Sequence, residues 1–336
     1  MRYRSLATTR GRAAARCHRR ISTRCSEPSE SWQYESQRFL GEGRDWNAVK
    51  QALASAVAGT AEFPGGHSPI PFGVAPPPTR ASGAPRERTT WALELAYLGS
   101  EFDAFTWQPD RERTVMGLLH KAIEPLIDGA HATMLSSAGR TDAGVSALAQ
   151  CISFYSWPEL DAEALRRAVD GAAPVPGALR LLHARRVPRD FHATFSARSR
   201  QYAYLLPCRD ADAEAEAARI DALLAPLPGA RRDYAALGRG LPKGKDTHTT
   251  LRRATARAVP LVPGGAARAV RIDVEGDRFL RRMVRTLVAS ASWLAHTNAA
   301  DDALLHAATS GDQRATAPAA PPFGLCLLGA AYGDSE

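Results

Sequence analysis

Short segments in which apolar and polar residues alternate dominate the chain from Thr90 onward, and they constrain the fold more than any other feature. This alternation predicts strands over residues 90–99, 149–156, 180–186, 201–206, 268–274 and 324–331. Apolar residues at helical spacing predict helices between them, over 114–127, 161–169 and 279–294. Because several strands are short and have a half-buried pattern, antiparallel pairing is favoured over a doubly wound parallel sheet. The sequence therefore predicts an α+β fold.

The residues before Thr90 have a different composition. Residues 1–26 contain eight arginines and no acid, which is typical of an organellar transit peptide for a mitochondrion or plastid. The alternative is a basic tail that contacts RNA in a cytoplasmic or nuclear protein. Residues 59–88 are rich in Gly, Pro, Ser and Ala, and only Trp46–Val57 has helical character. We therefore expect 27–89 to be a poorly ordered arm and linker.

The net charge of +8 does not by itself indicate RNA binding. Without the eight leader arginines, the 43 basic residues fall to 35, which equals the number of acidic residues. A neutral body can still carry a basic groove, because phosphate binding depends on local charge placement. No apolar run reaches the length of about 18 residues that a membrane span needs. No set of cysteines and histidines has the spacing of a metal site.

The segment Ala138–Val145 (AGRTDAGV) is the densest group of informative residues. Two glycines permit a tight backbone around Asp142 and close approach of a ligand. Arg140, two residues away, can hold this acid ionised, and an ionised carboxylate suits a nucleophile or a general base. The alternative from the residues alone is a turn in which Asp142 bonds to backbone amides.

Two further segments combine basic and aromatic residues. Residues 191–204 (FHATFSARSRQYAY) lead into a strand, and here rings can stack on bases while arginines meet phosphates. The alternative is that Tyr202 packs in the core. Residues 276–285 (GDRFLRRMVR) predict a helix on which Arg281 and Arg285 lie four apart and can converge on a carboxylate or a phosphate. The alternative is a solvated basic face.

These three segments, in this order, resemble the motifs of the TruA family of tRNA pseudouridine synthases. The resemblance covers residues 92–332 and includes the segments AYLGSEFDAFTWQ and PPFGLCLLGAAY at either end. It implies that Asp142 is the catalytic aspartate and that Arg285 forms a salt bridge with it. It also implies that Tyr202 stacks on the target uracil and that Arg140 helps to hold the flipped nucleotide.

The resemblance implies a pseudouridine synthase fold, in which two α/β subdomains (90–197 and 198–333) form one continuous, mainly antiparallel sheet flanked by helices, with the active-site cleft between them. It implies isomerisation of uridine in the anticodon stem-loop of tRNA, around positions 38 to 40, by a homodimer. No cofactor is expected, because the reaction needs no redox group and no nucleotide-binding fingerprint occurs. The remaining alternative is a catalytically silent RNA-binding or RNA-folding protein on the same scaffold.

The chain departs from the family pattern in two places that concern RNA contacts. Ser146 stands where a histidine usually follows the active-site motif. Residues 233–253 diverge, and this puts the choice of uridine in doubt. We expect possible RNA contacts at basic positions in or near the motifs, namely Arg198, Arg200, Arg281, Lys243 and Lys245.

Overall fold

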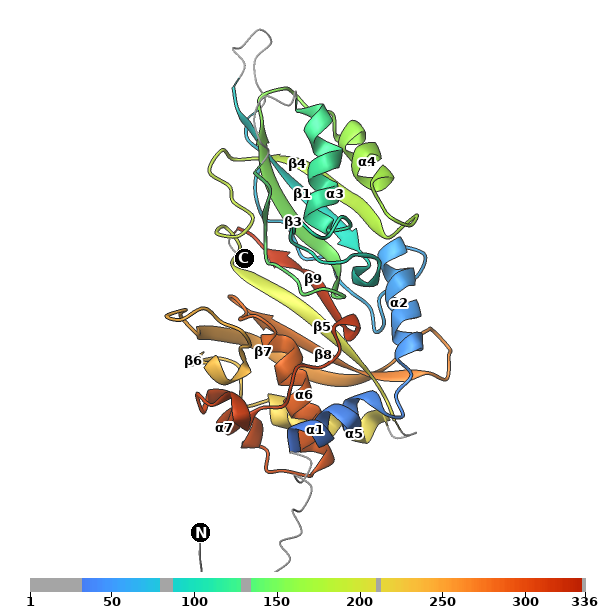
Figure 1. Ribbon diagram of the computed structural model, residues 1–336, viewed down its shortest axis with the longest axis vertical. Helices are drawn as coiled ribbons and strands as arrows, with labels where there is room; N and C mark the ends of the chain where they lie inside the picture. Colours follow the sequence, from blue (N-terminus) through green and yellow to red (C-terminus); the bar gives the residue numbers. More distant parts are fainter. Residues whose placement is uncertain (1–31, 79–86, 128–133, 210–212, 334–336) are drawn as a thin grey trace, which may run out of the picture.

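The computed structural model describes residues 32–78, 87–127, 134–209 and 213–333. In it, nine strands form a single sheet with the order β4-β1-β3-β9-β5-β8-β7-β6, and β2 pairs with β3 outside this path (Figure 1). The strands are β1 (Thr89–Tyr97), β2 (Ser136–Ser137), β3 (Ser146–Ser156), β4 (Leu179–Val187), β5 (Ser199–Pro207), β6 (Arg231–Asp233), β7 (His248–Pro260), β8 (Arg268–Gly276) and β9 (Leu325–Ala331). The Arg-rich residues 1–26 lie outside the described part of the chain.

The last strand, β9, joins the two halves of the sheet. It lies between β3 and β5, so residues from the end of the chain complete the centre of the molecule (Figure 1). β9 pairs antiparallel with β5 and parallel with β3 over a short register at Ser146 and Ala147. Every other pair in the described sheet is antiparallel, which confirms the mainly antiparallel α+β fold.

Helices cover one face of the sheet in two groups. α3 (Val115–Ile123) and α4 (Ala162–Gly171) pack over the first half, while α5 (Ala213–Leu224), α6 (Met283–His296) and α7 (Ala303–Thr309) pack over the second (Figure 1). Alternate residues of a strand point to one face, and on this face of β5 Tyr202, Tyr204 and Leu206 join the main core. None of the helices in the described ranges is long and apolar enough to cross a membrane.

Local sequence signals set the ends of the helices on the first half. Thr114 and Asp161 cap α3 and α4, and their side-chain oxygens accept hydrogen bonds from the backbone N–H groups of Gly117 (3.1 Å) and Ala164 (2.9 Å). The helix predicted over 114–127 ends at Ile123 and continues as a 3-10 turn that contains Pro125, because proline cannot donate a backbone hydrogen bond within a helix.

Helix α6 begins later than the sequence pattern predicts. The apolar spacing predicts a helix from Phe279, but α6 starts at Met283 because Arg282 adopts a left-handed conformation with φ 63°. Arg281 therefore precedes the helix, and the prediction that Arg281 and Arg285 lie on one helical face is wrong.

The prediction of a poorly ordered arm is wrong for residues 32–78. These residues form α1 (Trp32–Gly41), α2 (Trp46–Ala58) and an extended segment that crosses the sheet face opposite the helical layer. There, Leu53 of α2 and Phe63 pack against Leu205 of β5, and both are almost fully buried. Composition does not predict this order, because the apolar residues of the segment are buried by α6 and by the sheet rather than by one another.

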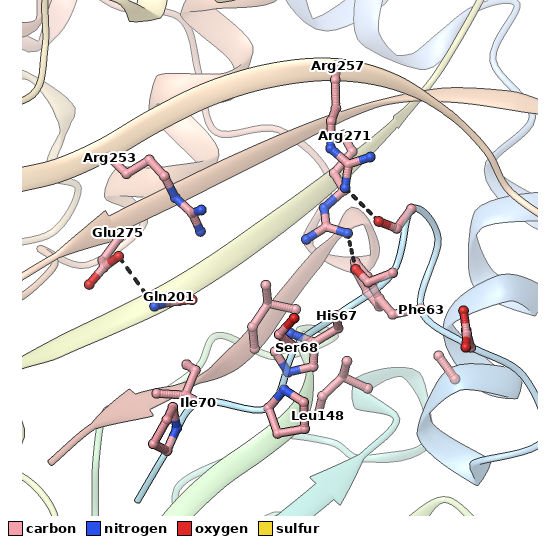
Figure 2. Close-up of a pocket in the computed structure, with 17 residues that line it drawn as sticks. Phe63, His67, Ser68, Ile70, Leu148, Gln201, Arg253, Arg257, Arg271 and Glu275 are labelled. Atoms are coloured by element: carbon pink, nitrogen blue, oxygen red, sulfur yellow. Dashed lines mark hydrogen bonds between the residues drawn. The ribbon is translucent and has the colours of Figure 1, made fainter. Parts of the chain in front are cut away.

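Arginine side chains bond the extended segment to the sheet. Arg271 of β8 is 5% exposed and donates to the carbonyl of Pro64 (2.9 Å). Arg257 of β7 donates to the carbonyl of Gly65 (2.7 Å), as Figure 2 shows. Between the segment and the sheet lies an open cavity of about 820 Å³, whose lining includes His67 and Arg253. The lining includes none of the residues predicted to act on RNA, so this cavity is separate from the predicted site.

Candidate active site

The active-site loop connects β2 to β3 at the junction of the two helix groups. Its turn is closed by a hydrogen bond from the N–H of Val145 to the carbonyl of Asp142 (3.1 Å). Gly144, the third residue of this turn, has φ 82°, a conformation that favours glycine. A side chain at this position would also contact the ring of Pro322 at 3.0 Å. Gly144 therefore serves backbone geometry, as the sequence predicts.

Buried polar side chains of β1 and β3 bond to this loop and hold it in place. The Tyr97 hydroxyl of β1 lies 2.8 Å from the Thr141 hydroxyl, directly before Asp142. The Gln150 amide of β3 donates to the carbonyl of Gly139 (2.8 Å). Sequence reasoning missed both supports, although Gln150 is a polar residue inside an apolar strand segment and is fully buried. A buried polar residue in such a segment is the signal that could have found it.

Ser146 also has a structural partner. Its side chain is buried, and its hydroxyl accepts a hydrogen bond from the N–H of Gly99 (3.0 Å). The residue that stands in place of the family's histidine therefore joins β3 to the loop after β1.

Asp142 and Arg285 come together at the mouth of this loop. Nη1 of Arg285 lies 2.7 Å from Oδ2 of Asp142, and Nε of the same guanidinium donates to the carbonyl of Ala320 (2.7 Å). The Asp142 side chain remains 25% exposed, whereas that of Arg285 is 12% exposed. The arginine is thus fixed by the protein, and the carboxylate is oriented by it while still facing solvent.

Arg140 does not fill the role of carboxylate partner that its spacing suggests. Its side chain is exposed, and it makes no hydrogen bond or ion pair with any residue in the described ranges. Arg285 already occupies the position beside the Asp142 carboxylate. Arg140 is therefore available to a ligand that approaches the loop.

Tyr202 forms one wall of the site from the centre of the sheet. It is 7% exposed, and its ring packs edge-on against Phe279 with centroids 5.2 Å apart. A side-chain carbon built at Gly139 would lie 3.8 Å from the Tyr202 hydroxyl, so the tyrosine borders the active-site loop. The hydroxyl has no hydrogen-bond partner among the residues that the structure describes. Burial and the nearby Asp142 charge raise the pKa of Tyr202 to about 12, so it is a neutral phenol near neutral pH.

Arg200 has a structural role in place of the predicted RNA contact. It is 8% exposed, and its guanidinium makes five hydrogen bonds to backbone carbonyls, those of Ala138 (two bonds), Thr194, Ala197 and Asp277. Because a guanidinium has five N–H donors, none is left for a phosphate. The prediction of an RNA contact at Arg200 is therefore wrong.

The other predicted RNA contacts lie on the surface. Arg198 and Arg281 are exposed, before β5 and before α6 respectively, and Lys243 and Lys245 are exposed in the loop that precedes β7. The structure does not bring the two lysines into contact with the Asp142 loop, so their role stays a prediction.

Comparison with known proteins supports the resemblance of the motifs. A family model described as tRNA pseudouridine synthase matches residues 233–333. A protein from Chloroflexus aurantiacus named tRNA pseudouridine synthase A is 32% identical over 265 residues, which cover 72% of this chain and 88% of that protein. Proteins with the same name from Methanosarcina acetivorans and Neisseria meningitidis are 34% and 28% identical, covering 73% and 74% of this chain and 85% and 94% of those proteins. With the catalytic motif intact and this extent of identity, the chain belongs to the tRNA pseudouridine synthase A (TruA) family.

Proposed function

We propose that this protein converts uridine to pseudouridine in tRNA. The relatives that match most of this chain are named tRNA pseudouridine synthase A. The observation that carries the proposal is the Asp142–Arg285 pair at 2.7 Å, in which the carboxylate is oriented and partly exposed.

The reaction is an isomerisation within one nucleotide. The glycosidic bond between N1 of uracil and C1′ of the sugar breaks, the uracil turns, and C5 bonds to C1′. C5 loses a proton and N1 gains one, so no atom is gained or lost. The target uridine must first leave the base stack, as base-modifying enzymes require.

Each site residue has a part in this scheme that its position supports. Asp142 acts on the nucleotide, either as a nucleophile or as a base on a sugar proton, and Arg285 keeps its carboxylate in one orientation. Tyr202 stacks on the uracil at the edge of the loop. The exposed guanidinium of Arg140, which pairs with no residue in the described ranges, holds the phosphate or sugar of the flipped nucleotide.

A catalytically silent RNA-binding protein on the same scaffold is the competing function. Such a protein would have no use for a carboxylate at an RNA-binding surface, because a carboxylate repels phosphate. The retained Asp142–Arg285 pair therefore favours the enzyme.

Mapping of pseudouridine in an unmodified tRNA transcript incubated with the purified protein tests this function. We expect new pseudouridines to form without added nucleotide or redox cofactor. A transcript that keeps all of its uridines would show that the proposed function is wrong.

We further propose that the target uridines lie in the anticodon stem-loop, around positions 38 to 40, and that a homodimer binds the tRNA. Both points follow from the family resemblance. The exposed Lys243 and Lys245 are suited to contact phosphates beyond the target nucleotide. The same mapping gives the positions, and light scattering of the free protein gives its oligomeric state. Pseudouridine outside the stem-loop or a monomer in solution would contradict the respective point.

Residues 1–26 are proposed to direct the protein to a mitochondrion or plastid, on the strength of their eight arginines and lack of acids. Fusions of a fluorescent protein to the full chain and to a chain without residues 1–26 test this. An organellar signal that becomes diffuse on truncation supports the proposal, and an unchanged distribution contradicts it.

A further inference from the structure

An exposed aromatic residue, Phe195, lies in a loop that Arg200 joins to the active-site loop. Phe195, in the loop between β4 and β5, is 83% exposed, more than any other large hydrophobic side chain in the described ranges. A single exposed hydrophobic residue needs no special explanation. The way in which this ring is held, however, distinguishes it from a loose surface side chain.

The Phe195 ring packs against another residue of its own loop. Its centroid lies 4.4 Å from that of the His192 ring, and the two rings are tilted by 33°. His192 is fixed in turn, because its Nδ1 accepts from the N–H of Thr194 (3.1 Å) and its own N–H donates to the Ser196 hydroxyl (3.0 Å). A ring that is already ordered loses little conformational entropy when it binds a ligand.

The Phe195 loop and the active-site loop share one support. Nη2 of Arg200 donates to the carbonyl of Thr194 (2.6 Å) and to that of Ala138 (2.8 Å). Ala138 is the first residue of the AGRTDAGV motif. The Thr194 hydroxyl also donates to the carbonyl of Ser137 (2.6 Å). The backbone directly before Phe195 is therefore fixed relative to the loop that carries Asp142.

We propose that the exposed ring of Phe195, packed against His192, is a platform for an unpaired base of the RNA that lies next to the target nucleotide. An exposed aromatic face binds an unpaired base by stacking, and such contacts tolerate any base. The exposed Arg140 and Arg198 lie on the two segments that Arg200 joins, where they can meet the flanking phosphates. This inference rests on the proposed function, because the platform requires an RNA substrate.

The test compares three substitutions of Phe195 that differ in stacking and apolar character. F195A removes the ring, F195L keeps apolar volume without a π face, and F195W restores stacking. Affinity is measured for an unmodified tRNA transcript with uridines at positions 38 to 40, in the D142N background so that the RNA is not turned over. Pseudouridine formation is then measured for the same substitutions with Asp142 intact.

We expect F195A and F195L each to weaken tRNA binding about 10-fold or more, and F195W to bind within about twofold of the parent. All variants should keep their unfolding temperature, because the side chain is exposed. Parental affinity of F195A, or equal affinity of F195L and F195W, would overturn the platform. Failure of the proposed function is distinct from these results, because then the protein with Phe195 and Asp142 intact forms no pseudouridine.

Discussion

The guanidinium of Arg285 holds the carboxylate of Asp142 at 2.7 Å across 143 residues of sequence. The same guanidinium donates to the carbonyl of Ala320, so helix α6, the segment before β9 and the active-site loop meet at one side chain. The proposed catalytic group, on the first half of the sheet, is thus oriented by a residue from the second half.

Replacing Arg285 with lysine should slow the reaction more than it weakens binding. A single ammonium group cannot reproduce the fork that serves both Asp142 and Ala320, so the carboxylate loses its fixed orientation. We expect kcat to fall about 100-fold, the scale of a small misplacement of a catalytic group. Single-turnover kinetics give the rate, and filter binding gives the tRNA affinity, which should change only a few fold. An unchanged rate in R285K would mean that the ion pair is not needed.

Replacing Tyr97 with phenylalanine should loosen the active-site loop. The substitution leaves the Thr141 hydroxyl without its partner and should destabilise the protein by about 1–3 kcal/mol. A double-mutant cycle with T141V, measured by urea denaturation and by kcat, isolates the contact. Strictly additive effects of the two substitutions would show that the hydroxyl pair does not hold the loop.

Replacing Arg200 with methionine should lower the free energy of unfolding of the protein, and not only weaken its RNA binding. Backbone carbonyls of three segments lose their donor, so we expect a loss of at least about 3 kcal/mol in the free energy of unfolding. R252M is the matched control, because Arg252 is exposed and donates to a single carbonyl, and it should change stability by no more than about 0.5 kcal/mol. Equal stability of R200M and R252M in urea denaturation would contradict the structural role.

Alkaline pH should destabilise the fold through its buried tyrosines. Burial raises the pKa of Tyr202 from 10.0 to about 12, and the pKa values of Tyr97, Tyr204 and Tyr332 are raised for the same reason. Below pH 10 the stabilisation is fully present, and it is lost as pH rises towards 12, because the unfolded chain ionises first. For Tyr202 the loss reaches about 3 kcal/mol.

Tyrosinate absorbance and circular dichroism, followed together across this range of pH, measure the effect. We expect both signals to change in one cooperative transition, and Y202F to reduce the alkaline loss of stability. Gradual ionisation near pH 10 with unchanged circular dichroism would be incompatible with these buried phenols.

The sequence predicts the centre of the fold better than its periphery. The alternation that predicts strands over 90–99 and 149–156 and the apolar spacing that predicts helices over 114–127 and 161–169 are local signals, and the structure has these elements as β1, β3, α3 and α4. β7 was missed because its inward positions are mostly small, such as Ala254 and Ala256, and arginines lie between them. The ordered segment before β1 was missed because the sheet that buries it is distant in sequence.

The sequence also predicts some contacts of the candidate site and not others. The motif resemblance predicts the Asp142–Arg285 salt bridge, and the structure confirms that contact. Spacing alone predicts Arg140 as the partner of Asp142. It cannot show that Arg285, 143 residues away, lies beside the Asp142 carboxylate. Arg200 was assigned to RNA because sequence does not reveal that its five donors all meet carbonyls inside the protein.

The most direct test of the account is pseudouridine mapping of a tRNA transcript incubated with D142N beside the wild-type protein. Asparagine keeps the shape of the side chain but removes the carboxylate that Arg285 holds. We predict that the wild type forms pseudouridine, whereas D142N binds the same tRNA and leaves every uridine unchanged. Pseudouridine at the same positions and the same rate with D142N would contradict the central claim that the Asp142 carboxylate carries the reaction.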